Sequence, residues 1–111
     1  MTSLSIDVHL AGPTCELALC GALDAPGSQD LRDKGLLGLR ETRIETLVID
    51  LSAVAAIDAV GMESLVLLRN VAQARHKRLI LRGASDRVDD ALHEAHLTKL
   101  FAMVDAPARV S

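Results

Sequence analysis

The stretch LVIDLSAVAAIDAVGMESLVLLRNVAQARHKRLILR at 47–82 decides the fold. It opens with LVIDL at 47–51, a nearly continuous apolar run that is typical of a strand covered on both faces. After a predicted loop at 52–61, the segment 62–78 places apolar residues on one helical face and ends in basic residues, which suit the negative end of a helix dipole. LILR at 79–82 resumes a strand. The stretch therefore predicts a βαβ unit built around a central parallel strand.

The residues before this unit predict a hairpin followed by a helix. In LSIDVHL at 4–10, apolar and polar residues alternate with a period of two, which indicates a half-buried strand. AGPT at 11–14 supplies a turn, and CELALCG at 15–21 gives a second, antiparallel strand. Its two cysteines would point to opposite faces of that strand, so they are interpreted as small apolar residues and not as a disulfide. LDAPGSQDLRDKGLLGL at 23–39 is predicted as a helix with a proline near its start.

The residues after the βαβ unit predict one more helix and a short tail. GASD at 83–86 ends the strand, and Ser85 suits the N-cap of the following helix. The tail is expected to fray at Pro107. The apolar tail residues expected to dock on the core are Leu97, Leu100 and Phe101. The predicted order is β β α β α β α, an α/β fold with a mixed sheet in a single domain spanning 1–111.

Composition excludes several function classes. The net charge is −3 and the only aromatic residue is Phe101, so the chain lacks both the basic patch and the stacking surface of a nucleic-acid binder. No apolar run approaches the roughly 18 residues of a spanning helix, and the first ten residues do not look like a secretory signal. We therefore expect a cytoplasmic protein with no direct membrane insertion.

The residues that could carry chemistry do not form a known catalytic or cofactor pattern. The sequence contains no nucleophile with an accompanying base, no paired carboxylates and no phosphate-binding glycine loop. His93 and His96 lie three positions apart on a predicted helix, but no third ligand accompanies them and the H-E-x-x-H spacing is absent. The prediction is a binding protein with no enzymatic activity, no cofactor and no metal.

Five segments carry a resemblance to a known family: GALD at 21–24, VIDLS at 48–52, IDAVGM at 57–62, LILRGAS at 79–85, and L-x-x-A-x-L-x-x-L-F ending at Phe101. Their order and spacing resemble the STAS domain, the module shared by sulfate transporters and anti-sigma factor antagonists. The resemblance covers most of the chain. Because no transporter portion accompanies it, the chain looks like the stand-alone antagonist branch.

In that branch, a loop of the form D-S-S-G or D-S-T-G opens the helix after the central strand, and a partner kinase phosphorylates its last hydroxyl residue. Here the corresponding loop is DAVG at 58–61, and the position that matches the phosphoacceptor is Val60, which has no hydroxyl. The resemblance thus implies that the usual phosphorylation switch cannot operate at this position. Ser52 and Ser64 are the nearest hydroxyls, and neither matches the acceptor position.

The resemblance also implies a partner-binding surface, comprising Asp24, Asp58, Ala59, Val60, Gly61, Met62 and Ser64. Some of these residues have structural interpretations of their own. Asp58 is first of all an N-cap, with partner contact as a second role, and Asp24 is first of all a turn or N-cap residue. Gly61 is interpreted as a site of close backbone approach. Met62 has two possible interpretations, as a core residue of its helix or as an exposed hydrophobic anchor for a partner.

Three functions remain open. The leading hypothesis is an anti-sigma factor antagonist that binds an anti-sigma factor or related serine kinase and regulates the availability of a sigma factor. The alternative is an accessory STAS subunit of a membrane-lipid transport permease or of a signalling scaffold. A binder of nucleotide or lipid is the third. A homodimer is compatible with each of them.

Overall fold

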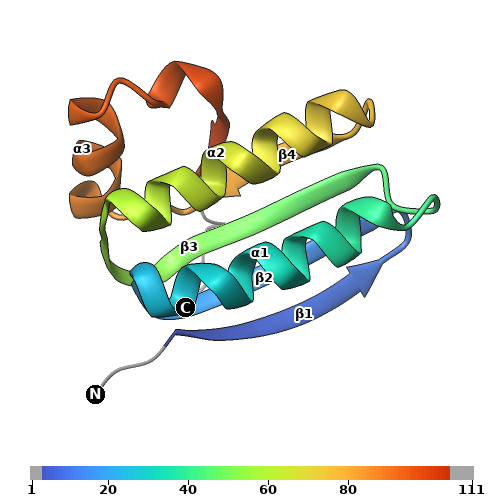
Figure 1. Ribbon diagram of the computed structural model, residues 1–111, viewed down its shortest axis with the longest axis horizontal. Helices are drawn as coiled ribbons and strands as arrows, with labels where there is room; N and C mark the ends of the chain where they lie inside the picture. The colour runs from blue at the N-terminus through green and yellow to red at the C-terminus, as the bar shows by residue number, and fades with distance from the viewer. Residues whose placement is uncertain (1–3, 106–111) are drawn as a thin grey trace.

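The computed structural model describes residues 4–105, which form a five-stranded mixed sheet with helices (Figure 1). The elements are β1 (Ser5–Ala11), β2 (Thr14–Leu23), α1 (Ala25–Arg40), β3 (Thr46–Ile57), α2 (Ala59–Ala74), β4 (Arg78–Arg82), α3 (Asp86–Glu94), a 3₁₀ turn (Thr98–Leu100) and β5 (Ala102–Val104). The strand order is β1-β2-β3-β4-β5, with β1 antiparallel to β2 and all other neighbours parallel. The predicted hairpin, βαβ unit and mixed sheet are confirmed.

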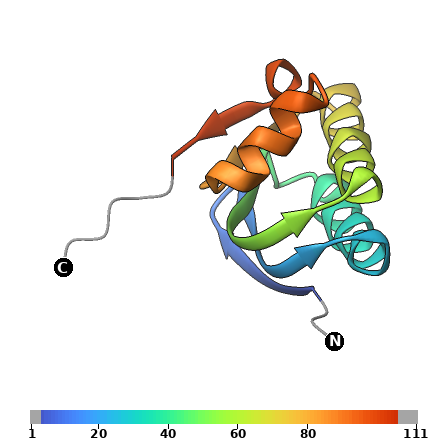
Figure 2. The same cartoon turned by 90° about the vertical axis from the view of Figure 1, so that its left-hand side faces the viewer.

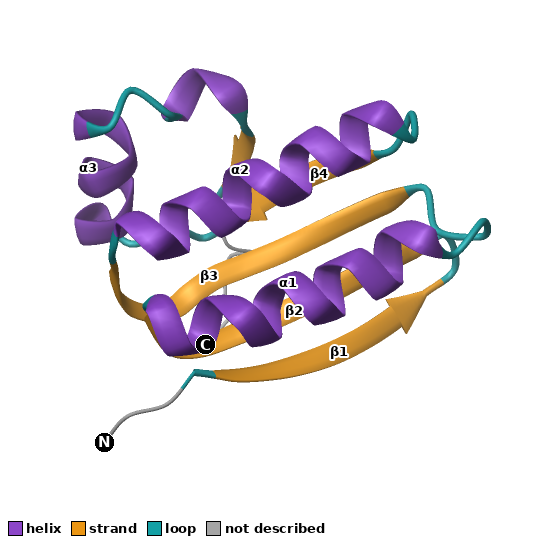
Figure 3. Cartoon of the chain, in the orientation of Figure 1, coloured by secondary structure: helices purple, strands orange, loops and turns teal. Residues whose placement is uncertain are grey.

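The helices lie mainly on one face of the sheet. α1 and α2 run side by side across that face, and α3 stands at the end of the sheet where β3 leads into α2 (Figures 1 and 2). Colouring by secondary structure shows the same division into a strand layer and a helix layer (Figure 3). The opposite face of the sheet carries mostly polar or small side chains that are at least partly exposed, among them Glu16, Ala18, Asp50, Ser52 and Arg82.

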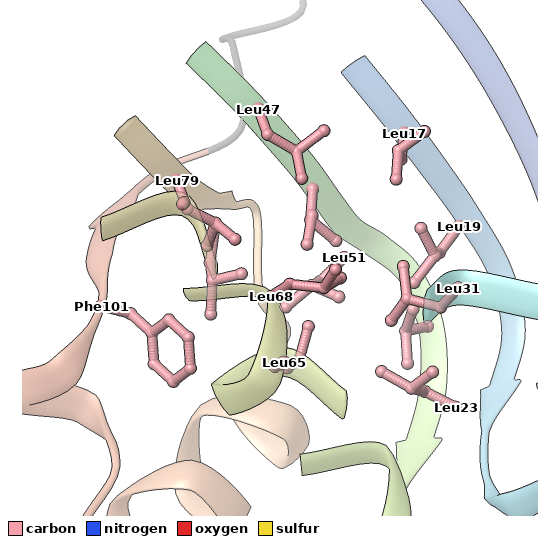
Figure 4. Packing of buried hydrophobic residues seen from close by; sticks show 14 of the residues in the cluster. Leu17, Leu19, Leu23, Leu31, Leu47, Leu51, Leu65, Leu68, Leu79 and Phe101 are labelled. Carbon is pink, nitrogen blue, oxygen red and sulfur yellow. The ribbon is translucent and has the colours of Figure 1, made fainter. Parts of the chain in front are cut away.

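The core fills the space between the sheet and the helices, and leucine dominates it. It includes Leu17 and Leu19 from β2, Leu51 from β3, and Leu65 and Leu68 from α2, and Figure 4 shows Leu51 beside Leu68. All five are at most 2% exposed. Branched aliphatic side chains without polar atoms pack such an interior at high density, which fixes α2 against the strands whose ends form the candidate site described below.

The two cysteines lie on opposite faces of β2, as predicted, and both are free thiols. Cys15 is buried against α1, where the Cβ that Gly38 lacks would lie 3.2 Å from its sulfur. Burial raises the pKa of the Cys15 thiol. Cys20 is exposed on the open face of the sheet.

Several boundaries differ from those predicted. The expected loop after residue 51 is wrong, because β3 continues to Ile57 by pairing with the second half of β2, with register shifts between Ala18 and Cys20 and between Gly21 and Ala22. Such irregularities break the period-two pattern that the sequence offers. The second helix begins at Ala59 and ends at Ala74, so the basic residues predicted for its last turn lie beyond it.

The tail also differs from the prediction. Phe101 is buried, as expected, but Leu100 is 38% exposed. Residues Ala102–Val104 add a fifth strand parallel to β4, which the sequence analysis missed because three residues carry no readable periodicity. The expected fraying at Pro107 lies outside the described residues.

Candidate partner-binding site

Two helices begin side by side at one end of the sheet. Leu23 of β2 pairs with Ile57 of β3, and the next residues are Asp24 and Asp58. The Asp24 Oδ1 accepts a hydrogen bond of 3.1 Å from the Gly27 N–H, and the Asp58 backbone N–H donates to the Leu23 carbonyl at 3.2 Å. The structure therefore brings Asp24 and the 58–61 loop together, as the sequence analysis expected.

Asp58 is the N-cap of α2. Its Oδ1 accepts a hydrogen bond of 2.8 Å from the Gly61 N–H, one of the donors that a helix start leaves without an internal partner. Asp58 is nevertheless an exposed residue. The cap interpretation is confirmed for Asp58 and for Asp24, which caps α1 in the same way.

Gly61 has a structural reason to be glycine. A β-carbon at this position would lie 2.2 Å from the carbonyl oxygen of Leu23 and 2.9 Å from the Leu23 Cγ. Contacts that short do not occur in folded proteins, so the first turn of α2 reaches the end of β2 only without a side chain. The close approach expected of Gly61 is confirmed.

The first two residues of α2 are Ala59, which is exposed, and Val60, which is half-buried. The N-terminal turn of a helix presents free N–H groups and the positive end of the helix dipole, a favourable environment for a phosphate. Neither side chain has an oxygen that could carry one. The turn therefore offers a partner an apolar surface on a helix end.

Ser64 does not reach the surface. It is 1% exposed, and its hydroxyl donates to the Gly61 carbonyl at 2.7 Å, within the same helix. The partner contact that the resemblance implied for Ser64 is incompatible with this burial, because a docked protein would meet the residues around it instead. Ser52 is exposed on the open face of the sheet and donates to the Asp50 Oδ1 at 2.6 Å.

A shallow apolar groove begins beside the Asp58 cap. It lies between α2 and the end of α3 and has a volume of about 310 Å³. Its lining residues are Ala59, Met62, Glu63, Val66, Ala95 and Leu97. Met62 both packs against the core and lines this groove, so the two interpretations left open by the sequence are combined in one side chain.

The groove was only partly predictable. Residues 59, 62, 63 and 66 recur at the spacing of one helical face, and that signal was available in the sequence. Val66 lies on the apolar face predicted for residues 62–78, and Leu97 was predicted to dock on the core. Both pack against the core while remaining partly exposed. The contribution of Ala95 depends on how α3 ends against α2, which no local pattern encodes.

Groups that could hold a metal do not converge. Among residues 4–105, no three side chains of His, Cys, Asp or Glu lie close enough together to ligate one. His93 and His96 are both exposed, and His96 lies beyond the end of α3 in a left-handed conformation with a φ of 59°. None of the helices in the described part of the chain is long and apolar enough to cross a membrane.

Sequence comparison identifies the family to which the chain belongs. The profile described as "Mlab, STAS domain" matches residues 6–105. The chain belongs to this STAS domain family. The family resemblance inferred from the five sequence segments is thereby confirmed.

Solved structures with the same fold include both classes of STAS protein. An anti-sigma factor antagonist from Mycobacterium paratuberculosis has a TM-score of 0.81 at 20% identity, with 96% of this chain and 87% of that chain covered. The phosphorylated form of the Bacillus cell fate determinant SpoIIAA gives 0.73 at 18%, covering 92% and 91%. A sulfate transporter family protein from Wolinella succinogenes gives 0.71 at 22%, covering 86% and 79%. At these identities the likeness establishes the STAS fold.

Proposed function

We propose that this STAS domain is an anti-sigma factor antagonist that binds an anti-sigma factor or related serine kinase in the cytoplasm without a phosphorylation switch. The binding surface is the N-terminal turn of α2 together with the groove between α2 and α3. One observation carries the proposal: this helix end is exposed beside an apolar groove, while position 60 is Val and the nearest hydroxyl in the helix, Ser64, is buried.

The chemistry of this surface defines the partner that fits it. The groove is lined mainly by apolar residues and by the exposed Glu63, and the exposed Asp58 directly precedes its lining residue Ala59. A complementary partner places an apolar side chain in the groove and basic side chains opposite the two carboxylates. Binding such a kinase-like anti-sigma factor releases the sigma factor that it would otherwise hold.

The structural relatives support this class of function. Anti-sigma factor antagonists are among the chains with the same fold, and one of them is described in a phosphorylated form. In this chain the helix end lacks a group to phosphorylate at position 60. Partner binding is therefore expected to be constitutive, and controlled by the abundance of the partners.

The test compares the native chain with Val60→Asp and Leu67→Asp in affinity purification with mass spectrometry, followed by titration of the partner recovered. Val60→Asp puts a negative charge where the family carries phosphate, and we expect it to weaken binding of a kinase-like anti-sigma factor about tenfold or more. An acidic residue near a helix N-terminus is itself favourable, so the variant stays folded. Leu67→Asp places the same charge on an exposed site of α2 and controls for a change in net charge.

A second candidate is an accessory subunit of a membrane-lipid transport permease. The absence of a hydroxyl at the helix end favours it, because a surface without a switch suits a subunit that stays assembled, and the fold also occurs in a sulfate transporter family protein. This candidate predicts co-purification with a transporter ATPase, equally well for the native chain and for Val60→Asp. Recovery of that set of partners would contradict the antagonist proposal.

A further inference from the structure

The edge strand β1 offers a complete row of backbone hydrogen-bonding groups. β1 pairs with β2 through a two-residue loop, Gly12 and Pro13, whose flanking residues Ala11 and Thr14 face each other. In such a hairpin the flanking residues form a hydrogen-bonded pair, and alternate residues follow the same pattern. The N–H and C=O groups of Ile6, Val8 and Leu10 therefore point away from β2, and within residues 4–105 no strand pairs with that side.

Two of these side chains are more exposed to solvent than the sequence predicts. The alternation at 4–10 predicted a half-buried strand, but Val8 is 48% exposed and Leu10 is 69% exposed, so that prediction is wrong for both. They lie opposite Leu17 and Cys15, which are buried beneath α1, and thus face the helix side of the sheet just beyond the cover that α1 provides. Within residues 4–105, these two side chains are therefore left without a full apolar cover.

β1 lacks most of the features by which edge strands avoid pairing. Such strands often carry charged side chains, above all lysine, or proline, a bulge or very few residues, and of these β1 has one acidic residue, Asp7. β1 has seven residues, contains neither lysine nor proline, and pairs with β2 in one uninterrupted register. The opposite edge, β5, has only three residues. Long, regular and apolar on one face, β1 has the properties of a strand that is paired in the working molecule.

The sequence of β1 is complementary to itself in one antiparallel register. A twofold axis through Val8 places Val8 opposite Val8, Ile6 opposite Leu10, and Asp7 opposite His9 of the second copy. Asp7 and His9 are both exposed, and a histidine N–H can donate to a carboxylate in this arrangement. The register uses the whole strand, because Ser5 then faces Ala11. Shifting it by two residues along each strand removes the Asp7–His9 pair and leaves one end unpaired.

The backbone agrees with this register. The residues that would form hydrogen-bonded pairs across the axis, Ile6, Val8 and Leu10, are the same three whose N–H and C=O groups point outward. Three such pairs exchange about six hydrogen bonds. Asp7 and His9 then occupy the non-hydrogen-bonded pairs, in which side chains approach more closely.

We propose that two copies of this chain pair through β1 in this register and join their five-stranded sheets into one. The apolar side chains of the two β1 strands then lie together between α1 of one protomer and α1 of its partner. The candidate groove lies beyond β3, on the far side of the sheet from β1, so the dimer presents two grooves. This proposal is independent of the identity of the partner that the groove binds.

Disulfide cross-linking tests the register. In a Cys15→Ala, Cys20→Ser background, which removes the native thiol opposite Leu10, Val8→Cys puts two thiols on the twofold axis, where the Cα atoms of a hydrogen-bonded pair lie about 5.5 Å apart and a disulfide can form. Leu10→Cys is the matched control, because its two copies lie four residues apart along the strands, about 14 Å, and cannot bridge. We expect Val8→Cys to give a covalent dimer on mild oxidation and Leu10→Cys to stay monomeric on a denaturing gel. The double variant Ile6→Cys with Leu10→Cys is expected to link.

Sedimentation velocity of the full chain over a range of concentrations tests the dimer itself. The native chain is expected to associate, and Val8→Lys is expected to weaken association about tenfold or more, because two lysines would face each other across the axis. Leu100→Lys changes an exposed leucine outside the sheet and should leave association unchanged. A native monomer at all concentrations would overturn the proposal, as would equal cross-linking of Val8→Cys and Leu10→Cys, or β1 pairing with another protein's strand. A failed groove interaction with the β1 dimer intact would contradict only the proposed function.

Discussion

At Gly61 the first turn of α2 passes so close to β2 that a β-carbon would lie 2.2 Å from the carbonyl oxygen of Leu23. The neighbouring atom belongs to the backbone, so it cannot rotate away as a flexible side chain would. Helix propensity alone would favour alanine at this position. The glycine is therefore explained by packing, and the position of the whole helix end depends on it.

Replacing this glycine tests that explanation. We expect Gly61→Ala to lower the free energy of unfolding by about 2–3 kcal/mol, as overpacking does in a rigid site. The measurement is urea denaturation followed by circular dichroism. Gly38→Ala is the control, since its β-carbon would lie 3.2 Å from the Cys15 sulfur in a helix where alanine gains up to about 1 kcal/mol. Equal losses of unfolding free energy for the two substitutions would show that the close approach at Gly61 does not make a β-carbon destabilising there.

At the scale of elements, α1 and α2 begin with the same type of N-cap. Each helix follows a strand directly, and an aspartate at the junction accepts a backbone N–H three residues later. The two strands are neighbours, so the two helix starts lie together. In α2 the capping residue Asp58 is also exposed, so the proposed partner contact would add to its role in the cap.

Two substitutions separate these roles of Asp58. Asp58→Asn keeps an oxygen that can cap the helix, so stability should change by less than about 0.5 kcal/mol, whereas Asp58→Ala should cost about 1 kcal/mol. If the carboxylate also faces a basic group on the partner, Asp58→Asn weakens binding about twofold to fivefold, the size of one exposed ion pair. Thermal denaturation and calorimetric titration measure the two effects. Unchanged binding by Asp58→Asn would restrict Asp58 to its role in the cap.

The elements differ in how much of them the sequence could predict. The hairpin, the βαβ unit and the Ser85 cap of α3 were readable because each rests on local chemistry. The length of β3 could not be predicted, because residues 52–57 have the composition of a loop and become a strand only by pairing with β2. Likewise, alternation in β1 identified a strand and its faces, but whether a face is covered depends on how far α1 extends over it.

The candidate site divides in the same way. Asp24, Asp58 and Gly61 were located correctly because capping and close approach follow from positions next to strand ends. Burial of Ser64 was not foreseen, since the inward side of α2 is defined by contacts with distant strands. The groove could not be predicted in full because it forms only where α2 and the end of α3 come together.

At the scale of the whole molecule, helices cover one face of the sheet and the other face is held by polar contacts. Arg82 of β4 reaches across this open face, donating from Nε at 3.1 Å and from Nη2 at 2.8 Å to the Asp50 Oδ2 of β3. Its Nη2 also contacts the Glu16 carboxylate of β2. One guanidinium thus joins three adjacent strands. Because its side chain is only 21% exposed, it is less screened than an ordinary surface ion pair.

Removing this guanidinium tests whether the open face contributes to the stability of the sheet. We expect Arg82→Met to lower the free energy of unfolding by about 1–2 kcal/mol, because two carboxylates are left facing each other without a cation. Lys34→Met is the control: it removes a partly exposed pair with Asp30 one turn away in α1, a type of pair that contributes about 0.3–0.5 kcal/mol. Adding Glu16→Gln to Arg82→Met should recover part of the loss by removing one of the repelling charges. Urea denaturation of the four proteins at one salt concentration measures these differences. If Arg82→Met cost no more than Lys34→Met, the three strands would be held by their backbone ladders and apolar core alone.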